Sequence, residues 1–191
     1  VYIKVVHGFL REGDSITLCF GDQSQGSPGM RLQTFCEETY EFRVLVDPIA
    51  TYTYQPLPEQ PTIAIVPGPA EHWQAVLPTL RRKGEEFRLC LKAEDAWGNP
   101  SDQADSRLEL RADNIGNLPE SVDFEAGRFA LEIAGLVAAG TGDCTVEVLQ
   151  DGQVVAVSNP LRVVEATELL PYWGDLHGQS EETIGSNSAR D

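Results

Sequence analysis

Short runs of alternating or β-branched residues recur about every 8–12 residues along this chain, and this spacing constrains the fold more than any other feature. The runs cover residues 2–6, 15–20, 31–36, 40–46, 62–66, 73–77, 85–93, 106–111, 128–133, 144–149, 153–157 and 161–165. Residues 130–139 alone have a helix-favouring composition, and Gly135 and Gly140 predict a short turn there at most. The pattern therefore predicts an all-β fold of the sandwich type.

A proline-rich stretch marks the best domain boundary. Five of the 12 prolines lie between residues 55 and 69, and such clusters are typical of linkers. We expect an N-terminal β unit at residues 1–66 and an immunoglobulin-like β-sandwich at residues 70–165, because one such domain needs about 100 residues. Residues 166–191 form a short C-terminal tail of different composition.

The charge of the chain excludes several classes of partner. There are 30 Asp and Glu residues against 14 Lys and Arg, a net charge of −16. Such a surface repels a phosphate backbone, so we expect no nucleic acid and no membrane as partner. No apolar run approaches the length of about 18 residues that a spanning helix needs. We therefore expect a soluble protein, cytoplasmic or periplasmic, and the sequence leaves its oligomeric state open.

From its two ends we expect this sequence to be part of a longer polypeptide. The sequence begins at Val1 without an initiator Met, and it lacks the long apolar stretch of a signal peptide. Because a signal sequence belongs to the start of a polypeptide, its absence here does not fix the compartment.

Four cysteines, at positions 19, 36, 90 and 144, permit three disulfide pairings. Strand periodicity places Phe87, Leu89, Leu91 and Ala93 on one face and Cys90 on the other. Cys144 instead shares the core side of its own strand with residues 146 and 148, so a bond from Cys90 to Cys144 needs a bulge. The pattern favours free thiols, and no C-x-x-C spacing indicates a zinc site.

Two surface segments have a structural and a functional interpretation. The glycine-rich loop at residues 21–29 lacks the G-K-[ST] ending of a phosphate-binding loop, and a strand follows it, so we expect a long hairpin loop. The basic run Arg81-Arg82-Lys83 predicts either a solvated turn or salt bridges to nearby acidic residues.

Four aspartates crowd the turn region around Trp97, at positions 95, 102, 105 and 113. Their oxygens suit a calcium ion, but the spacing of an EF-hand loop is missing. Carboxylates at exposed strand ends are ordinary in so acidic a chain, and we favour that interpretation.

The tail carries the most informative pattern. In an extended segment Asp175, His177 and Gln179 point to the same face, as the ligands of a metal ion do at a strand end. Imidazole and carboxylate suit zinc, manganese or iron, while an amide oxygen is a weaker ligand or a substrate partner. We expect Tyr172 and Trp173 to anchor this tail against the sandwich. The other histidines, His7 and His72, lie in the β units and are not expected to join the site.

The same residues resemble a known family. Tyr172-Trp173-Gly174-Asp175-Leu176-His177-Gly178-Gln179-Ser180 and the residues up to 188 resemble the opening motif of the bacterial domain of unknown function 3604. Its members look like distant relatives of the polymerase and histidinol phosphatase (PHP) metallohydrolases. Residues 20–36 are similar to a segment of its N-terminal region. Gly98-Asn99-Pro100 resembles a turn of bacterial immunoglobulin-like domains.

The resemblance implies that residues 1 to about 166 are a non-catalytic β region before a metal-dependent hydrolase of phosphoesters or related esters. The first PHP motif is His-x-His, so His177 corresponds to the first ligand and Gln179 replaces the second. Asp175 orients His177 or binds the metal itself. A divalent metal (Zn, Mn or Fe) belongs to the full-length protein, and we expect none to bind this fragment tightly. The implied partner is the protein's own C-terminal catalytic domain.

A second class of protein remains open. An acidic, immunoglobulin-like module that binds protein or carbohydrate without catalysis predicts exposed aromatic side chains on one sheet and no role for the tail.

Overall fold

The computed structural model describes residues 1–168, 171 and 174. Every regular element in them is a β-strand, so the all-β prediction is confirmed. The described part contains no helix long and apolar enough to cross a membrane. The chain divides into two compact units, Val1–Thr34 and Phe35–Asp191, so residues 35–66 belong to the same unit as residues 70–165.

Residues 1–34 contain turns but no strand, and the strands expected at 2–6, 15–20 and 31–36 do not form. Their apolar side chains stay in solvent, with Ile16 51% exposed, Leu18 48% and Phe20 53%. An alternating run becomes a strand only where a second strand pairs with it and a core covers one face. None of residues 1–66 is buried.

Residues 37–65 form a long antiparallel hairpin. β1 (Glu37–Glu41) pairs with β4 (Thr62–Ile65), and further along the arm β2 (Leu45–Val46) pairs with β3 (Gln55–Pro56). The side chain of Gln60 bridges the arm, since it accepts from the Val44 N–H at 2.6 Å and donates to the Val44 carbonyl at 3.2 Å. At the tip the Asp47 carboxylate accepts the backbone N–H of Tyr52 at 2.7 Å.

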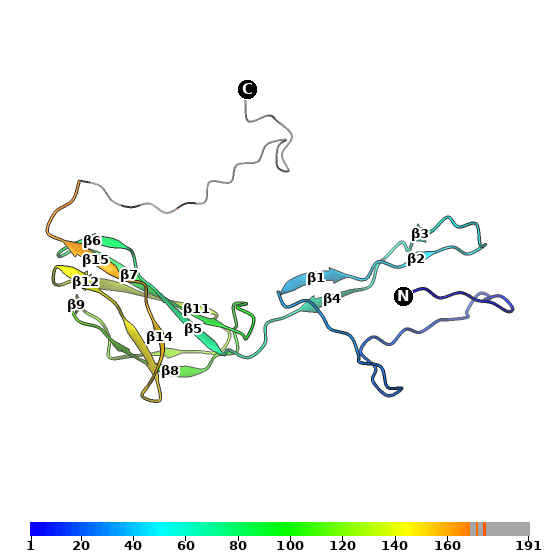
Figure 1. Ribbon diagram of the computed structural model, residues 1–191, viewed down its shortest axis with the longest axis horizontal. Helices are drawn as coiled ribbons and strands as arrows, with labels where there is room; N and C mark the ends of the chain where they lie inside the picture. The colour runs from blue at the N-terminus through cyan, green and yellow to red at the C-terminus, as the bar shows by residue number, and fades with distance from the viewer. Residues whose placement is uncertain (169–170, 172–173, 175–191) are drawn as a thin grey trace, which may run out of the picture. The chain divides into compact units, whose positions relative to one another are not determined.

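The sandwich of residues 70–165 has two layers (Figure 1). One sheet has the order β5-β7-β11-β9, a second has the order β10-β8-β13-β14, and three further strands pair in the order β12-β15-β6. Parallel pairing occurs between β15 and β6, and the other described pairs are antiparallel. The first sheet comprises β5 (His72–Val76), β7 (Glu86–Glu94), β11 (Ala130–Ala138) and β9 (Ile115–Gly116). The second layer comprises β10 (Ser121–Phe124), β8 (Ser106–Arg111), β13 (Glu147–Gln150), β14 (Gln153–Val157), β12 (Gly142–Cys144), β15 (Leu161–Val164) and β6 (Leu80–Arg82).

One apolar core lies between the layers. It takes Phe87, Leu89, Leu91 and Ala93 from β7, as the alternation predicts, and the facing layer contributes Leu108, Leu110, Val146 and Val148. The rings of Trp73 on β5 and Phe124 on β10 meet edge to face, with centroids 4.9 Å apart. Burial of an apolar core between two layers of mainly antiparallel strands is what an immunoglobulin-like β-sandwich requires, and that fold is confirmed.

β11 differs from the expected short turn. It runs from Ala130 to Ala138 and pairs with β7, and the register shifts between Ile133 and Leu136. Gly135 sits at this shift with a φ of 75°, a conformation that suits glycine. Tertiary pairing with β7 therefore overrides a helix-favouring local composition.

The cysteines follow the predicted parity. Cys144 is buried in the core, whereas Cys90 lies half-buried on the outer side of β7. All four cysteines are free thiols.

Candidate functional site

The five site residues that the sequence predicts lie outside the described residues. These are the metal-ligand candidates Asp175, His177 and Gln179 and the anchor candidates Tyr172 and Trp173. The structure does describe how the chain leaves the sandwich toward them.

β15 is the last strand before the tail, and its neighbours hold it on both sides. It lies between β12 and β6 in its sheet. The side chains of Leu161 and Val163 are buried in the core, so the strand is fixed by packing as well as by backbone hydrogen bonds. The chain therefore starts toward the tail from an anchored position.

The basic run holds the end of β15 and the residues that follow it. The Lys83 N–H donates to the Val164 carbonyl at 2.9 Å, and the Lys83 ammonium lies 3.3 Å from the Glu165 carboxylate. The Arg82 guanidinium donates to the Thr167 carbonyl at 2.8 Å. Of the two interpretations of this run, a solvated turn or salt bridges to nearby acidic residues, the structure supports the second, since Lys83 pairs with Glu165. Because the Lys83–Glu165 pair is exposed, its energy is small, and the two bonds to backbone carbonyls define the path of the chain.

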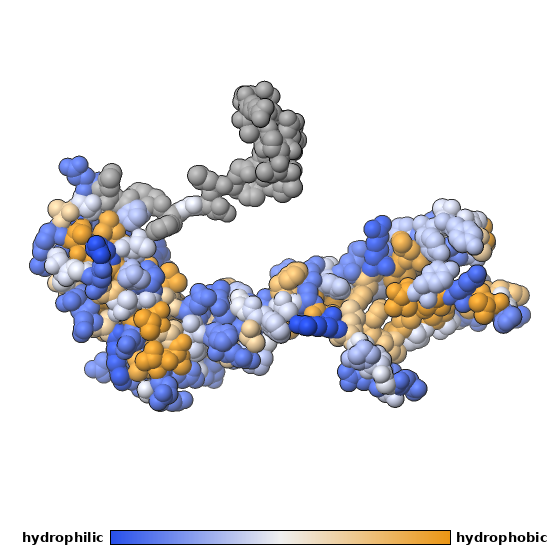
Figure 2. Space-filling model, in the orientation of Figure 1, coloured by the Kyte–Doolittle hydropathy of each residue, from blue (hydrophilic) through white to orange (hydrophobic). Residues whose placement is uncertain are grey.

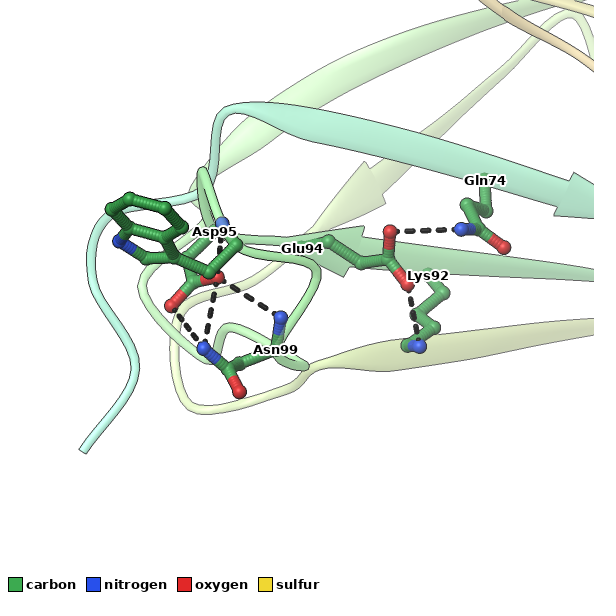
Figure 3. A network of polar contacts seen from close by, with 6 residues as sticks. Gln74, Lys92, Glu94, Asp95 and Asn99 are labelled. Atoms are coloured by element: carbon green, nitrogen blue, oxygen red, sulfur yellow. Dashed lines mark hydrogen bonds and ion pairs between the residues drawn. The ribbon is translucent and has the colours of Figure 1, made fainter. Parts of the chain in front are cut away.

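The turn after β7 is organised by one carboxylate. Asp95 is only 3% exposed. It accepts the backbone N–H groups of Gly68 at 3.1 Å and of Trp97 and Asn99 at 2.9 Å, and it also accepts the Asn99 side-chain amide. Figure 3 shows Asp95 and Asn99 facing one another in this turn. Burial raises the pKa of Asp95, but the hydrogen bonds from Asn99, Gly68 and Trp97 outweigh it and lower the pKa to about 2.

This arrangement leaves Asp95 little capacity for a metal ion. No group of three or more His, Cys, Asp or Glu side chains able to hold a metal occurs among the residues the structure describes. Asp102, Asp105 and Asp113 are exposed and do not gather around Asp95. The calcium interpretation of these four aspartates therefore has no support.

A second polar network lies beside the first (Figure 3). The Glu94 carboxylate is buried, and it accepts from the Gln74 amide at 2.8 Å and from the Lys92 ammonium at 2.6 Å. These contacts join β5 to β7. Because each charged group has its partner, the network explains strand pairing and offers no reactive group.

An open hollow of about 190 Å³ lies beside Cys144, and Asp113, Asp143 and Thr145 also line it. Burial, and to a lesser extent the nearby Asp143 charge, raises the pKa of the Cys144 thiol. The thiol points to the Leu161 carbonyl, and Arg162 engages both oxygens of Asp143. The raised pKa makes the Cys144 thiol a poorer nucleophile, and the Asp143 carboxylate is paired with Arg162, so neither group is activated for catalysis.

Sequence reasoning missed the role of Asp95, although the signal was present. An Asp followed by Gly98, whose φ is 83°, and by Asn99 is typical of a turn in which the Asp side chain accepts hydrogen bonds from the backbone N–H groups that follow it. Asp95 also reaches Gly68, which lies 27 positions earlier in the chain. That distant contact cannot be read from a local pattern.

The described fold and its apolar core define the class of this protein as an immunoglobulin-like β-sandwich. No family model matches the chain, and no curated protein matches it.

Two solved structures are similar to it. The Escherichia coli adhesin FdeC matches 68% of this chain at 18% identity with a TM-score of 0.39. The sulfur carrier protein SoxY from Chlorobium limicola f thiosulfatophilum matches 52% of this chain and 86% of its own, at 13% identity and a TM-score of 0.30. This chain covers 41% of the adhesin chain. At these TM-scores neither similarity supports an inference about function.

Proposed function

We propose that residues 1–166 are the non-catalytic β region of a PHP-like metal-dependent hydrolase that acts on phosphoesters or related esters. In this proposal the sandwich holds the start of the catalytic domain, and the chain has no complete active site of its own. The observation that carries the proposal is the fixed path of the chain after β15. Arg82 and Lys83 donate to the Thr167 and Val164 carbonyls, and Thr167 lies only ten residues before His177. The resemblance of residues 172–188 to the family's first motif supports it.

The residue types in the tail are ones that bind metal ions in proteins. His177 supplies an imidazole nitrogen, Asp175 a carboxylate and Gln179 an amide oxygen, and these donors suit Zn, Mn or Fe. A catalytic site needs at least three protein ligands, and an amide is a weak one, so further ligands must come from the following domain. A divalent metal held by these residues would supply an activated water for hydrolysis. In this proposal Asp175 either orients the His177 ring or binds the metal itself.

The test uses the complete encoded polypeptide and two matched variants. His177→Ala removes the proposed ligand, while His72→Ala removes an exposed imidazole on β5. With p-nitrophenyl phosphate and bis-p-nitrophenyl phosphate as probes, we expect His177→Ala to lower kcat/KM by about 100-fold or more. His72→Ala is expected to match the parent. Equal activity of all three proteins, or a parent without hydrolase activity toward any ester, contradicts the proposal.

A second candidate function rests on the loops at one end of the sandwich. Trp97 and Phe129 are both exposed, and the Phe129 carbonyl accepts the N–H of Ala93 close to the Asp95 turn. Exposed aromatic rings on fixed loops suit a module that binds protein or carbohydrate. Glycan-array binding that is lost in Trp97→Ala and kept in His177→Ala favours this function over the hydrolase region.

A further inference from the structure

The hairpin formed by β1 and β4 has an edge that no other strand covers. β4 pairs with β1 on one side, and in the part of the chain that the structure describes no strand pairs with its other side (Figure 1). None of the hairpin residues is buried. An isolated two-stranded ribbon is marginally stable in water, and a third strand or a packing surface stabilises it. The hairpin is therefore incomplete by itself.

The hydrogen-bond pattern shows which backbone groups β4 offers. The Phe42 N–H donates to the Pro61 carbonyl at 2.8 Å, and Tyr40 lies opposite Ile63. Because hydrogen-bonded and non-bonded pairs alternate in an antiparallel ladder, Ile63 directs its N–H and C=O toward β1. Thr62 and Ala64 then direct theirs to the open edge.

The two edges of the hairpin differ in charge. β1 carries Glu37, Glu38 and Glu41, and charged residues are a common means of protecting an edge from pairing. The sequence from Gln60 to Ala70 contains no charged residue, in a chain whose net charge is −16. Hydrophobic residues are visible at the surface over this region and over the sandwich in Figure 2, and those of β4 and its end include Ile63 and Val66. β4 is thus the unprotected edge.

We propose that β4 pairs antiparallel with β4 of a second copy of this chain, giving a four-stranded sheet in the order β1-β4-β4-β1. Across a two-fold interface residue i contacts residue j and j contacts i, and residues near the axis lie close to their own equivalents. In a pairing strand as short as β4, a charge therefore lies close to the same charge of the second copy. An uncharged strand is what self-pairing requires, and β4 satisfies this requirement. The glutamates of β1 lie on the far edges of the new sheet. Pro61 and Pro67, which have no N–H, bound the pairing segment at both ends.

Another uncharged edge strand, β14, is less suited to this pairing. Val154, Val155 and Val157 are exposed on it, but β5 lies beside it. At its end the Asn159 side chain accepts the Leu77 N–H at 2.8 Å and donates to the Leu77 carbonyl at 2.9 Å. The edge of β14 is therefore partly covered within its own domain.

The oligomeric state of the 191-residue chain tests the proposal. Analytical ultracentrifugation over a wide concentration range is expected to show a monomer–dimer equilibrium for the parent. Ala64→Glu places a glutamate on the open edge, and we expect it to raise the dimer Kd at least about 10-fold, because like charges meet across the interface. In Ala64→Gln the new side chain has nearly the size of glutamate without its charge, so we expect a dimer Kd close to that of the parent. Thr39→Glu adds the same charge to β1 and serves as the matched control.

Ala64 is exposed, so none of these changes disturbs the sandwich core, and an unchanged melting temperature verifies the fold. A parent that stays monomeric at millimolar concentration overturns the proposal. So does a dimer that Ala64→Glu leaves intact or that Thr39→Glu weakens equally. If Val155→Glu alone dissociates the dimer, the interface is the edge of β14 and the β4 proposal is wrong.

Discussion

Replacing Phe124 by alanine tests the packing of the two layers most severely. The ring is 1% exposed and meets Trp73 edge to face at a centroid distance of 4.9 Å. Phe124 comes from β10 in one sheet and Trp73 from β5 in the other, so the contact spans the core. Removing a fully buried phenylalanine side chain costs about 3–5 kcal/mol, and part of this is the aromatic pair, worth about 0.5–1.5 kcal/mol.

The matched control is Phe129→Ala. It makes the same chemical change at a side chain that is 55% exposed, and we expect the free energy of unfolding to change by no more than about 0.5 kcal/mol. Urea unfolding of both variants gives the free energies directly. In thermal unfolding, a loss of 1 kcal/mol in the free energy of unfolding lowers the Tm of a domain of about 100 residues by about 4–8 °C. Phe124→Ala should therefore lower Tm by at least about 12 °C. Equal losses for the two variants would refute the assignment of Phe124 to a core between the sheets.

Three further predictions concern single residues. The pKa of Asp95 is about 2 in the folded chain against an ordinary 3.8, so its stabilising effect is complete above about pH 4 and is lost as the pH falls toward 2. The melting temperature of the parent should therefore fall more steeply than that of Asp95→Ala over this range, and parallel curves would contradict the account. Cys144 is buried with a raised pKa, so Ellman's reagent should label exposed Cys19 at once and Cys144 only after unfolding. Comparable rates for the two thiols in the folded chain would show that Cys144 is accessible. Gly135→Ala should destabilise the sandwich by about 1 kcal/mol or more because its φ of 75° disfavours a side chain, whereas Ala134→Gly should have a smaller effect in urea unfolding. A neutral Gly135→Ala would argue against the bulge.

The sequence predicts those features that depend on a local period of two residues. The core face of β7, the outer position of Cys90 and the inner position of Cys144 all follow from alternation alone. Strand pairing is not local, which is why residues 15–20 have the alternation of a strand and yet form none. The same reason explains β11, where pairing with β7 extends the strand through Gly135. For the candidate site, the sequence identified Asp95 as notable, but its bond to Gly68 depends on the tertiary fold. The basic run at residues 81–83 likewise acquires its role from a strand about 80 positions later.

In the proposed function the sandwich carries no metal, and the segment after β15 supplies the first ligand of a metal site. Metal content after equilibration with Zn²⁺ or Mn²⁺ and gel filtration, measured by plasma mass spectrometry, tests it most directly. The account predicts metal in the complete encoded polypeptide, a reduced metal content in His177→Ala, an unchanged content in His72→Ala, and no metal in residues 1–168. A full metal complement in His177→Ala, or stoichiometric metal in residues 1–168, would contradict it.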